Sequence, residues 1–560
     1  MIHNLNFENQ KAYLKKLAAS MSRHELVSFI RSAAEKAGME KFREQAAEEI
    51  IRITKPADVI PDIYGEYRQI AHDGILFLLS NFSPARLAEL VADQLMMEEN
   101  VSVEERLIRL AGQIPTLHKL GQIIARNRNV APSFRKWLIR LENDLDGSDI
   151  AAVQKNIREE IGGFVKAFSI RTDDRILAEA SVGAVVAFTW LKPDTGERAK
   201  GVFKILRPGI KEYLDEELSL LDETAIFFEK NRERYPLKDF RFIETFRDIK
   251  EALQEETDLP GEQANLRKAF RFYSGEELAR IPRVLPFSTE NLTAMEFMNG
   301  GKITDVPIGS DDREMCAQLL FKAVIGHPLF SGEEQTLFHG DPHAGNIFAF
   351  EGKNDVDMKV TLLDWSQAGY LSKLQRIKML RLMIGVITRD KRLICEAVGK
   401  LSKENLKEEP LFLKNLEKII HDIVVSCEYA SYPLVKKTFF LIDQSMLRGI
   451  SFPRELLLFR KAFFTLEGLL HDLDPKFDMD VYMIRLVGDI FMEELPKRWA
   501  YLLFLHSDCP EYYRSMLSNT DIQKLANHLF IESFKKSTDI FSTLMEKNVE
   551  ILSKAFCLAR

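Results

Sequence analysis

The chain has 560 residues, of which 46% are hydrophobic and 29% are charged, and its formal net charge is −7. This composition is typical of globular proteins, and a chain of this length predicts about three or four domains or subdomains. Lysine and arginine are spread along the chain without clustering, which argues against nucleic acid as a main partner.

The cysteines and the apolar runs bear on the cellular compartment. Five cysteines lie far apart without a Cys-x-x-Cys pair, which argues against a disulfide framework and against a zinc site. The N-terminal residues carry charges where a signal peptide needs an apolar stretch, and no later apolar run approaches the ~18 residues of a membrane span. We therefore expect a cytoplasmic protein whose contact with a membrane, if it has one, is peripheral.

The first ~180 residues are predicted to be helical, because apolar residues recur at helical spacing and helix start signals are present. Two such signals are the capping pattern Ser22-x-x-Glu25 and the pair Ser83-Pro84. From Ala184 the pattern changes to β. The short apolar runs Ala184–Trp190 and 201–206 flank a turn-rich segment, which predicts a hairpin.

Further elements follow the hairpin. A helical pattern returns, and later short apolar runs predict strands, the first of which ends in Asn299-Gly300-Gly301 as a strand entering a hinge would. In chain order, the sequence predicts helix from about Glu212 to Phe272, strands at Leu292–Met298, Ile347–Phe350 and Lys359–Leu363, a polar turn at 351–357 between the last two, and mostly helix beyond Tyr370.

The strongest chemical signal is the run from His339 to Asn346, followed by a strand and Asp364. Asp341 and Asn346 have the spacing found in a kinase catalytic loop. In that loop the aspartate accepts or orients the hydroxyl of the nucleophile, and the asparagine, together with a later aspartate, holds Mg²⁺. One alternative is an ordinary surface turn rich in Asp, Pro, Gly and Asn. A second alternative is a metal site built from the two histidines of the run, although its proline and glycines disfavour the helix that this site would need.

A kinase also needs a strand lysine for the α and β phosphates, and Lys204 is the candidate. A turn of small residues at 180–183 precedes it, where backbone N–H groups could approach phosphates. The carboxylate that would hold the lysine is sought in the acidic segment 255–265. Each feature also has an ordinary explanation, namely a solvated strand lysine, a tight turn and a solvated helix face, and these stay open.

Together these blocks resemble the UbiB/AarF type of atypical protein-kinase-like family, which includes the coenzyme Q biosynthesis kinases. The resemblance runs from about Ile114 to Asp478. It rests on the Lys-x-Gly-Gln motif at 119–122, the alanine-rich loop at 180–183, the lysine strand with its Arg-Pro-Gly-Ile continuation at 203–210, the acidic motif Glu256-x-Asp258, the catalytic and metal loops at 338–346 and 362–364, and the helical tail around 452–475.

The resemblance implies an α+β, bilobal protein-kinase-like fold with a small β-containing N-lobe, a mostly helical C-lobe, and extra N- and C-terminal helices. We expect a helical N-terminal region of unknown role at 1–105 and the family-specific helical extension with the Lys-x-Gly-Gln motif at 106–175. The N-lobe would follow at 176–300, the C-lobe at 301–480 and C-terminal helices at 481–560.

The resemblance also implies roles for single residues. Lys204, oriented by Glu262, would neutralise the phosphates, and Asp341 would act as base or position water. The expected metal ligands are Asn346, Asp364 and Glu256. The expected nucleotide-binding positions are Ala180, Ser181, Val182, Gly183 and Lys204, the hinge residues Glu296 and Met298, and Lys119 and Gln122 on the helix that covers the active site in this family.

Some positions depart from the family pattern. Glu179 interrupts the alanine-rich loop, Ala184 stands where glutamine is common, and Asp364 is followed by Trp365-Ser366 in place of Phe-Gly. The last change weakens the expectation of activation-loop switching but keeps the metal-binding carboxylate. The chain also lacks the C-terminal membrane spans that some relatives carry.

The expected function is that of an ATP-dependent kinase-like protein, an ATPase or phosphotransferase that uses Mg-ATP and is linked to lipid, isoprenoid or small-molecule metabolism. Its partners would be ATP and ADP, with an unidentified lipid or small-molecule substrate and no nucleic acid, and both peripheral membrane contact and a homo-oligomer are left open. Two rivals stay open: a phosphotransferase of the aminoglycoside-kinase type, and a nucleotide-gated scaffold without catalysis. The Lys-x-Gly-Gln and Arg-Pro-Gly motifs count against the first, and the complete set of polar residues counts against the second.

Overall fold

The computed structural model describes most of the chain. The described residues are 20–98, 100–125, 137–138, 150–179, 182–207, 209–236, 242–275, 279–305, 310–350, 359–403, 416–425, 433–447, 450–503 and 508–528. Contacts divide the chain into two compact units, Met1–Ala264 with Arg283–Met298, and Asn265–Pro282 with Asn299–Arg560. One boundary between the units, after Ala264, falls inside a helix. The other two boundaries lie on either side of the segment Arg283–Met298.

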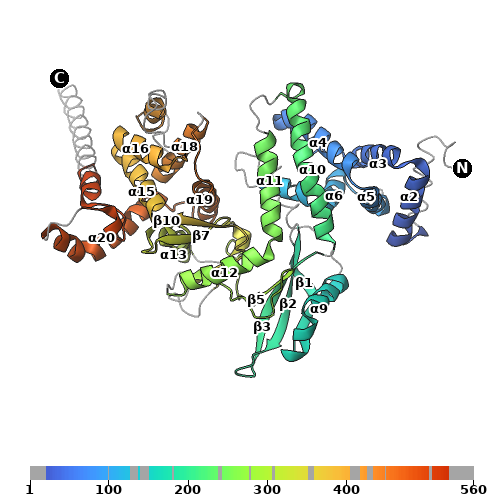
Figure 1. Ribbon diagram of the computed structural model, residues 1–560, viewed down its shortest axis with the longest axis horizontal. Coiled ribbons are helices and arrows are strands. Elements are labelled where there is room, and N and C mark those ends of the chain that lie inside the picture. The colour runs from blue at the N-terminus through green and yellow to red at the C-terminus, as the bar shows by residue number, and fades with distance from the viewer. Residues whose placement is uncertain are drawn as a thin grey trace, which may run out of the picture. The chain divides into compact units, whose positions relative to one another are not determined.

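The first unit begins with helices, coloured blue in Figure 1. Ser22 starts the first of them with a reciprocal capping box to Glu25, and Ser83 caps a later helix that has proline at its first turn, so both predicted start signals are confirmed. The later helices share an apolar core around Leu79, Phe82 and Leu110, whereas the first helix packs in a separate cluster. These helices are α2 (Arg23–Ala37), α3 (Met39–Thr54), α4 (Arg68–Asn81), α5 (Pro84–Met96) and α6 (Val103–Gln113), with a 3-10 turn η2 (Asp62–Tyr67) before α4.

Two more helices lead to an antiparallel sheet, α7 (Pro115–Ala125) and α9 (Ile150–Ala167). The sheet has the order β1-β2-β3-β5, and Figure 1 shows α9 beside it. Its strands are β1 (Arg171–Glu179), β2 (Gly183–Leu191), β3 (Arg198–Leu206) and β5 (Leu292–Glu296). The predicted hairpin is confirmed as β2 and β3, and the predicted hinge strand ends at Glu296, two residues early.

The prediction of helix up to about residue 180 was wrong for β1. This strand lies at the edge of the sheet and most of its side chains are exposed, so it shows no apolar alternation that would reveal a strand. The core of the sheet lies under β2, β3 and β5, where the Phe188 and Phe203 rings stack with centroids 3.9 Å apart and α9 contributes Ile157.

The predicted helical stretch after the hairpin is confirmed, and it is divided into three helices. They are α10 (Ile210–Lys230), α11 (Phe242–Thr257) and α12 (Leu259–Tyr273), with a short 3-10 turn η3 (Arg232–Arg234) after α10. Asp258 separates the last two, and its carboxylate Oδ1 accepts a hydrogen bond from the Gly261 N–H at 2.9 Å. A side chain that caps a first-turn N–H in this way begins a new helix, and α12 therefore starts at a defined residue.

The second unit contains two small sheets. One has the order β4-β9-β8-β6, and the other pairs β10 with β7. Their strands are β4 (Ala279–Arg280), β6 (Gly301–Lys302), β7 (Gln335–His339), β8 (Ile347–Phe350), β9 (Lys359–Leu362) and β10 (Ala368–Ser372). Strand β8 confirms its prediction and β9 agrees to within one residue, whereas β4, β6, β7 and β10 were not predicted. The turn predicted at 351–357 lies outside the described residues.

Helices make up most of the rest of this unit, as predicted. Aromatic rings fill its core, with Phe459 against Phe338 at 5.0 Å and Phe439 against Phe463 at 5.1 Å between centroids. The elements are α13 (Ser310–Phe321), the π-turn η4 (Lys322–Gly326), α14 (His327–Phe330), α15 (Lys373–Thr388), α16 (Lys391–Leu401), the π-turn η7 (His421–Val425), α18 (Leu434–Met446), α19 (Arg454–Leu473), α20 (Met479–Leu503) and a 3-10 turn η9 (Pro510–Tyr512).

The fold class agrees with the prediction: an α+β chain in which small sheets accompany many helices. Among the described residues, no helix combines the length and the apolar character that crossing a membrane requires. The division into five domains is a finer statement than the two compact units, and it stays a prediction.

Candidate functional site

Lys204 lies in the middle of the sheet of the first unit. It stands on β3 between Val185 of β2 and Thr293 of β5, and its Nζ is 2.8 Å from Glu262 Oε1. The side chains are 15% and 1% exposed, so this ion pair is largely shielded from water. A charge pair in such a place strongly constrains both side chains, because either charge alone would be costly to bury.

The first turn of α12 places Glu262. Its N–H donates to the Asp258 carbonyl at 3.0 Å, and the neighbouring Gln263 amide donates to the Thr289 carbonyl at 2.8 Å and to Thr293 Oγ1 at 3.2 Å. The start of α12 is thus anchored to β5 and the turn before it. Sequence reasoning did not identify Gln263, which was only part of an acidic run.

The helix of the Lys-x-Gly-Gln motif is α7. Lys119 is 4% exposed and forms an ion pair with Glu256 of α11, a partner that the resemblance implies. At the start of α7, the Thr116 N–H donates to Glu217 Oε2 of α10 at 2.7 Å, and this second anchor was not predicted. Gln122 lies in α7, but its side chain falls outside the described part of the structure.

The predicted phosphate loop is described in part. Ala180 and Ser181 lie outside the described residues. Val182 is buried in a small cluster with Leu206, and Gly183 begins β2. The Arg207 N–H donates to the Val182 carbonyl at 2.9 Å, so the end of the loop is tied to the end of the lysine strand.

The predicted adenine hinge follows β5. The Glu296 N–H donates to the Arg283 carbonyl at 3.0 Å, and the Glu296 carboxylate accepts from the Arg283 N–H at 3.3 Å. Met295 and Met298 are each 8% exposed. These residues end the first unit, and their role in adenine binding stays a prediction.

In the second unit, His339 organises the predicted catalytic loop. Its Nε2 donates to the Leu363 carbonyl at 2.8 Å, and its Nδ1 accepts from the Asp341 N–H at 3.2 Å. Complete burial lowers the pKa of His339, so the ring is neutral and can serve as donor and acceptor at once. Both ring nitrogens are engaged, which argues against the alternative of a metal site made by His339 and His343.

Asn346 connects the catalytic loop to the strand that leads to Asp364. Its Nδ2 donates to the Asp341 carbonyl at 3.2 Å, and its own carbonyl accepts from the Leu363 N–H at 2.8 Å. His339 and Asn346 therefore both bind Leu363, and the structure brings Asp341, Asn346 and Asp364 together in the second unit.

Asp364 has an unusual backbone conformation, with φ of 53°. Asp and Asn tolerate this left-handed region better than other non-glycine residues. The Asp364 Oδ1 accepts from the Ser366 N–H at 3.2 Å. The next residue, Trp365, is fully buried, its ring centroid is 4.8 Å from that of His339, and its carbonyl accepts from the Asn265 amide at 3.0 Å. A packed tryptophan thus stands where the family commonly has phenylalanine.

The donor set of the second unit fits Mg²⁺. The Asn346 amide nitrogen is held by the Asp341 carbonyl, which turns its oxygen away from that bond, and Asp364 supplies a carboxylate. Mg²⁺ is commonly held by one or two such oxygen ligands, with water and phosphate completing the octahedron. Among the described residues, no group of three or more His, Cys, Asp and Glu side chains is arranged to hold a metal ion.

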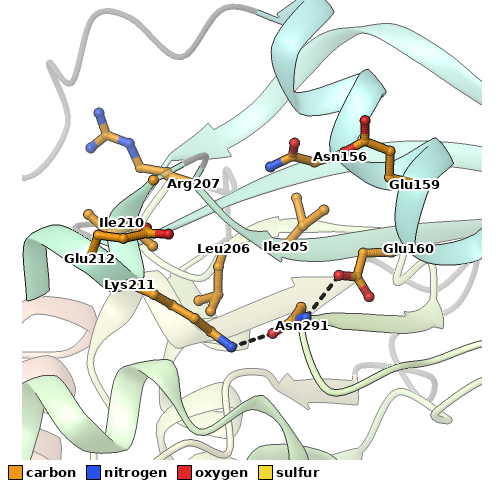
Figure 2. Close-up of a pocket in the computed structure, with 11 residues that line it drawn as sticks. Asn156, Glu159, Glu160, Ile205, Leu206, Arg207, Ile210, Lys211, Glu212 and Asn291 are labelled. Carbon is orange, nitrogen blue, oxygen red and sulfur yellow. Dashed lines mark hydrogen bonds between the residues drawn. The ribbon is translucent and has the colours of Figure 1, made fainter. Parts of the chain in front are cut away.

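A cavity of about 240 Å³ lies in the first unit, and Leu206 and Arg207 at the end of the lysine strand form part of its lining. Figure 2 shows a polar chain across it, in which Lys211 binds the Asn291 oxygen and the Asn291 amide donates to Glu160 at 2.8 Å. Neither Lys204 nor Glu262 lines this cavity. We therefore do not count the cavity as part of the candidate site.

Comparisons with known proteins bear on the family resemblance and on the fold class. Residues 140–398 match the ABC1 atypical kinase-like domain. This segment contains the candidate catalytic and metal-binding residues of both units, whereas Lys119 and Gln122 precede it.

Similar proteins cover more of the chain. The uncharacterized protein sll1770 of a Synechocystis strain is 23% identical over 381 residues, which are 67% of this chain and 62% of that protein. A probable protein kinase UbiB of Xanthomonas campestris is 26% identical over 434 residues, 72% of this chain and 74% of that protein. A solved complex of Rv3197 with erythromycin from Mycobacterium tuberculosis is similar with a TM-score of 0.40 and 17% identity, over 63% of this chain and 88% of the other.

The domain match and the relative named UbiB confirm the resemblance inferred from the motifs, together with the kinase-like fold class. They support the resemblance to this family and do not identify the reaction. The functions of the individual site residues rest on the geometry of this chain.

Proposed function

Because this chain carries an ABC1 atypical kinase-like domain and resembles the UbiB/ABC1 family throughout its motifs, we propose that it binds Mg-ATP and acts as an ATPase or phosphotransferase. The observation that carries the proposal is the shielded ion pair between Lys204 and Glu262 at 2.8 Å. A strand lysine held by a helix carboxylate is the arrangement by which kinases direct an ammonium group to the α and β phosphates.

The second unit supplies the other groups. Asn346 and Asp364 would hold Mg²⁺, and the bound ion would neutralise charge on the phosphates. Asp341, whose N–H is fixed by His339, accepts the proton of the attacking hydroxyl or orients a water. Glu256, the third expected metal ligand, is engaged by Lys119, and we assign it first to holding α7.

The substrate class is proposed from the resemblance. In this family the Lys-x-Gly-Gln helix covers the active site, so a lipid or other small molecule, or ATP hydrolysis coupled to it, fits better than phosphorylation of a protein in trans. Binding of adenine by the Glu296–Met298 backbone completes the proposal.

The first test is thermal stabilisation by Mg-ATP and Mg-ADP. A ligand at 100 times its dissociation constant stabilises the folded state by about 2.7 kcal/mol. Wild type is expected to be stabilised, and Lys204→Met and Asp364→Asn are expected to lose most of the effect. Asparagine suits the left-handed backbone at 364, so this variant removes the charge without adding strain.

Matched controls are Lys155→Met, an exposed lysine on α9, and Asp194→Asn in the β2–β3 turn. Both should respond like wild type. No stabilisation of wild type would overturn the ATP-dependent function. Stabilisation without ADP release, even with lipid, would favour a nucleotide-gated scaffold, and ADP release driven by amino alcohols or hydroxylated antibiotics would favour the aminoglycoside-kinase type.

A further inference from the structure

A buried arginine connects the N-terminal helices to the kinase-like part. Arg86 of α5 is 3% exposed, and its guanidinium carbon lies 4.1 Å from the centroid of the Phe82 ring and 4.8 Å from that of Tyr213. It donates to the Tyr213 carbonyl at 3.0 Å and to the Gln113 carbonyl at 3.3 Å, and it forms an ion pair with Glu217 of α10. A planar guanidinium with several fixed acceptors is a rigid connection.

Glu217 contacts both Arg86 and the start of α7. Its side chain is fully buried, and while one oxygen binds Arg86, the other accepts from the Thr116 N–H at 2.7 Å. Thr116 belongs to the first turn of α7, where backbone N–H groups have no partner within the helix. One buried carboxylate therefore joins α5 to the start of α7, and its negative charge suits the positive end of that helix.

Lys119 lies one turn further along α7 and binds Glu256 of α11. Two residues after Glu256, Asp258 caps α12, and Glu262 in the first turn of α12 binds Lys204. Hydrogen bonds and ion pairs, joined by α7 and by the segment 256–262, thus connect the N-terminal helices to Lys204, the lysine proposed to contact the phosphates.

We propose that the N-terminal helices, residues 20–113, position α7, and that Arg86 and Glu217 are the positioning residues through which they set the place of Lys119 and thereby the preference of the site between ATP and ADP. Neither residue touches the nucleotide; both act through α7. The inference gives a role to the N-terminal region, and its nucleotide part rests on the proposed function.

The test compares two buried arginines of the N-terminal helices. Arg86→Met removes the contact with Glu217, whereas Arg106→Met removes an arginine of α6 that is 8% exposed and donates to the carbonyls of Gln94 in α5 and of Glu98 just after it. Both variants are expected to lower the melting temperature. Only Arg86→Met is expected to raise amide hydrogen exchange across residues 115–125 and to change the ratio of the Mg-ADP and Mg-ATP dissociation constants, by about fivefold or more.

A double mutant tests whether Arg86 acts on the site through Lys119. If Arg86 acts through Lys119, Arg86→Met combined with Lys119→Met has the same ratio as Lys119→Met alone. Arg86→Lys keeps the charge and should restore most of the wild-type ratio. Equal effects of Arg86→Met and Arg106→Met, no effect of either, or effects of Arg86 and Lys119 that add independently would each overturn the proposal.

Hydrogen exchange separates this inference from the proposed function. If wild type binds neither nucleotide, the proposed function fails, and the ratio part of the inference fails with it. Exchange in 115–125 then still decides whether Arg86 holds α7: a rise in Arg86→Met but not in Arg106→Met supports the positioning role, and unchanged exchange overturns it.

Discussion

His339 supports the predicted catalytic loop through both of its ring nitrogens. It keeps one proton on Nε2 for Leu363 and a bare Nδ1 for the Asp341 N–H. If Nδ1 were protonated, its N–H would face the Asp341 N–H, and two hydrogen-bond donors would be in contact without an acceptor. The local geometry therefore requires the neutral ring, and burial, which lowers the pKa of His339, maintains it.

This pKa predicts a dependence of stability on pH. In the unfolded chain the histidine titrates near 6.5, and in the folded chain it titrates lower. Between these two values the unfolded state binds a proton that the folded state does not, so the free energy of unfolding falls as the pH falls below about 6.5, by at most about 1.4 kcal/mol per pH unit.

Urea unfolding of wild type and His339→Gln at pH 7.5, 6.5 and 5.5 measures the effect. Glutamine can still donate to Leu363 but does not titrate, so wild type should lose more stability than the variant on acidification. Parallel losses in the two proteins would show that His339 is not the titrating group.

At the scale of elements, two functional roles are open for Asp258. The resemblance places it in an acidic motif, whereas the structure shows its carboxylate capping α12. Asparagine caps a helix about as well as aspartate, and alanine does not, so the two roles can be separated.

We expect Asp258→Ala to destabilise the protein by about 1 kcal/mol and Asp258→Asn to have little effect on stability. Denaturant unfolding measures both, and nucleotide stabilisation of the Asn variant tests the other role. If Asp258→Asn folds like wild type but no longer responds to Mg-ATP, the charge matters for the site beyond its capping.

The four-stranded sheet of the first unit, β1-β2-β3-β5, depends on close packing at Gly201 of β3. A Cβ added there would overlap the Phe188 ring and would lie 3.0 Å from the Met295 carbonyl. Phe188 is stacked on Phe203 and cannot easily move away. Gly201→Ala should therefore destabilise the protein by about 1–3 kcal/mol, the usual range for overpacking.

Gly162→Ala is the matched control, because a Cβ added to this helical glycine of α9 would meet no other atom within 4 Å. It should be neutral or stabilise by up to about 1 kcal/mol. Thermal unfolding of both variants decides the matter, and equal stability of the two would mean that the sheet accommodates the methyl group.

At the scale of the whole molecule, the chain changes unit three times, so the second unit is not one continuous segment. Residues 265–282 belong to it and contribute Asn265 to Trp365, the fully buried Tyr273, whose hydroxyl donates to the Ala323 carbonyl at 2.9 Å, and β4 as the partner of β9. A fragment that begins at Asn299 would lack all of these contacts.

We therefore expect the fragment 299–560 not to reach a packed native state. It should bind a hydrophobic dye and lack near-UV circular dichroism, as expected when specific packing is lost. The full chain serves as the control. A cooperative unfolding transition of this fragment by itself would show that residues 265–282 are dispensable for its core.

Short-range features were predictable from the sequence alone. The capping pattern at Ser22, the hairpin that carries Lys204, strand β8 and the spacing of Asp341 and Asn346 depend on residues close together in the chain, and local backbone chemistry is sufficient to specify them. The family resemblance added the pairing of Lys204 with Glu262, which no local pattern could identify.

Only the tertiary structure decided the contacts between distant segments. Lys204 and Glu262 are 58 residues apart and Arg86 and Glu217 are 131 apart, and burial of their charges is tolerable only because each partner is supplied by another helix or strand. Strand β1 likewise depends on pairing with β2 and not on its own polar sequence. The sequence thus determined which residues could do chemistry, and the packing of distant elements determined which of them are held in place to do it.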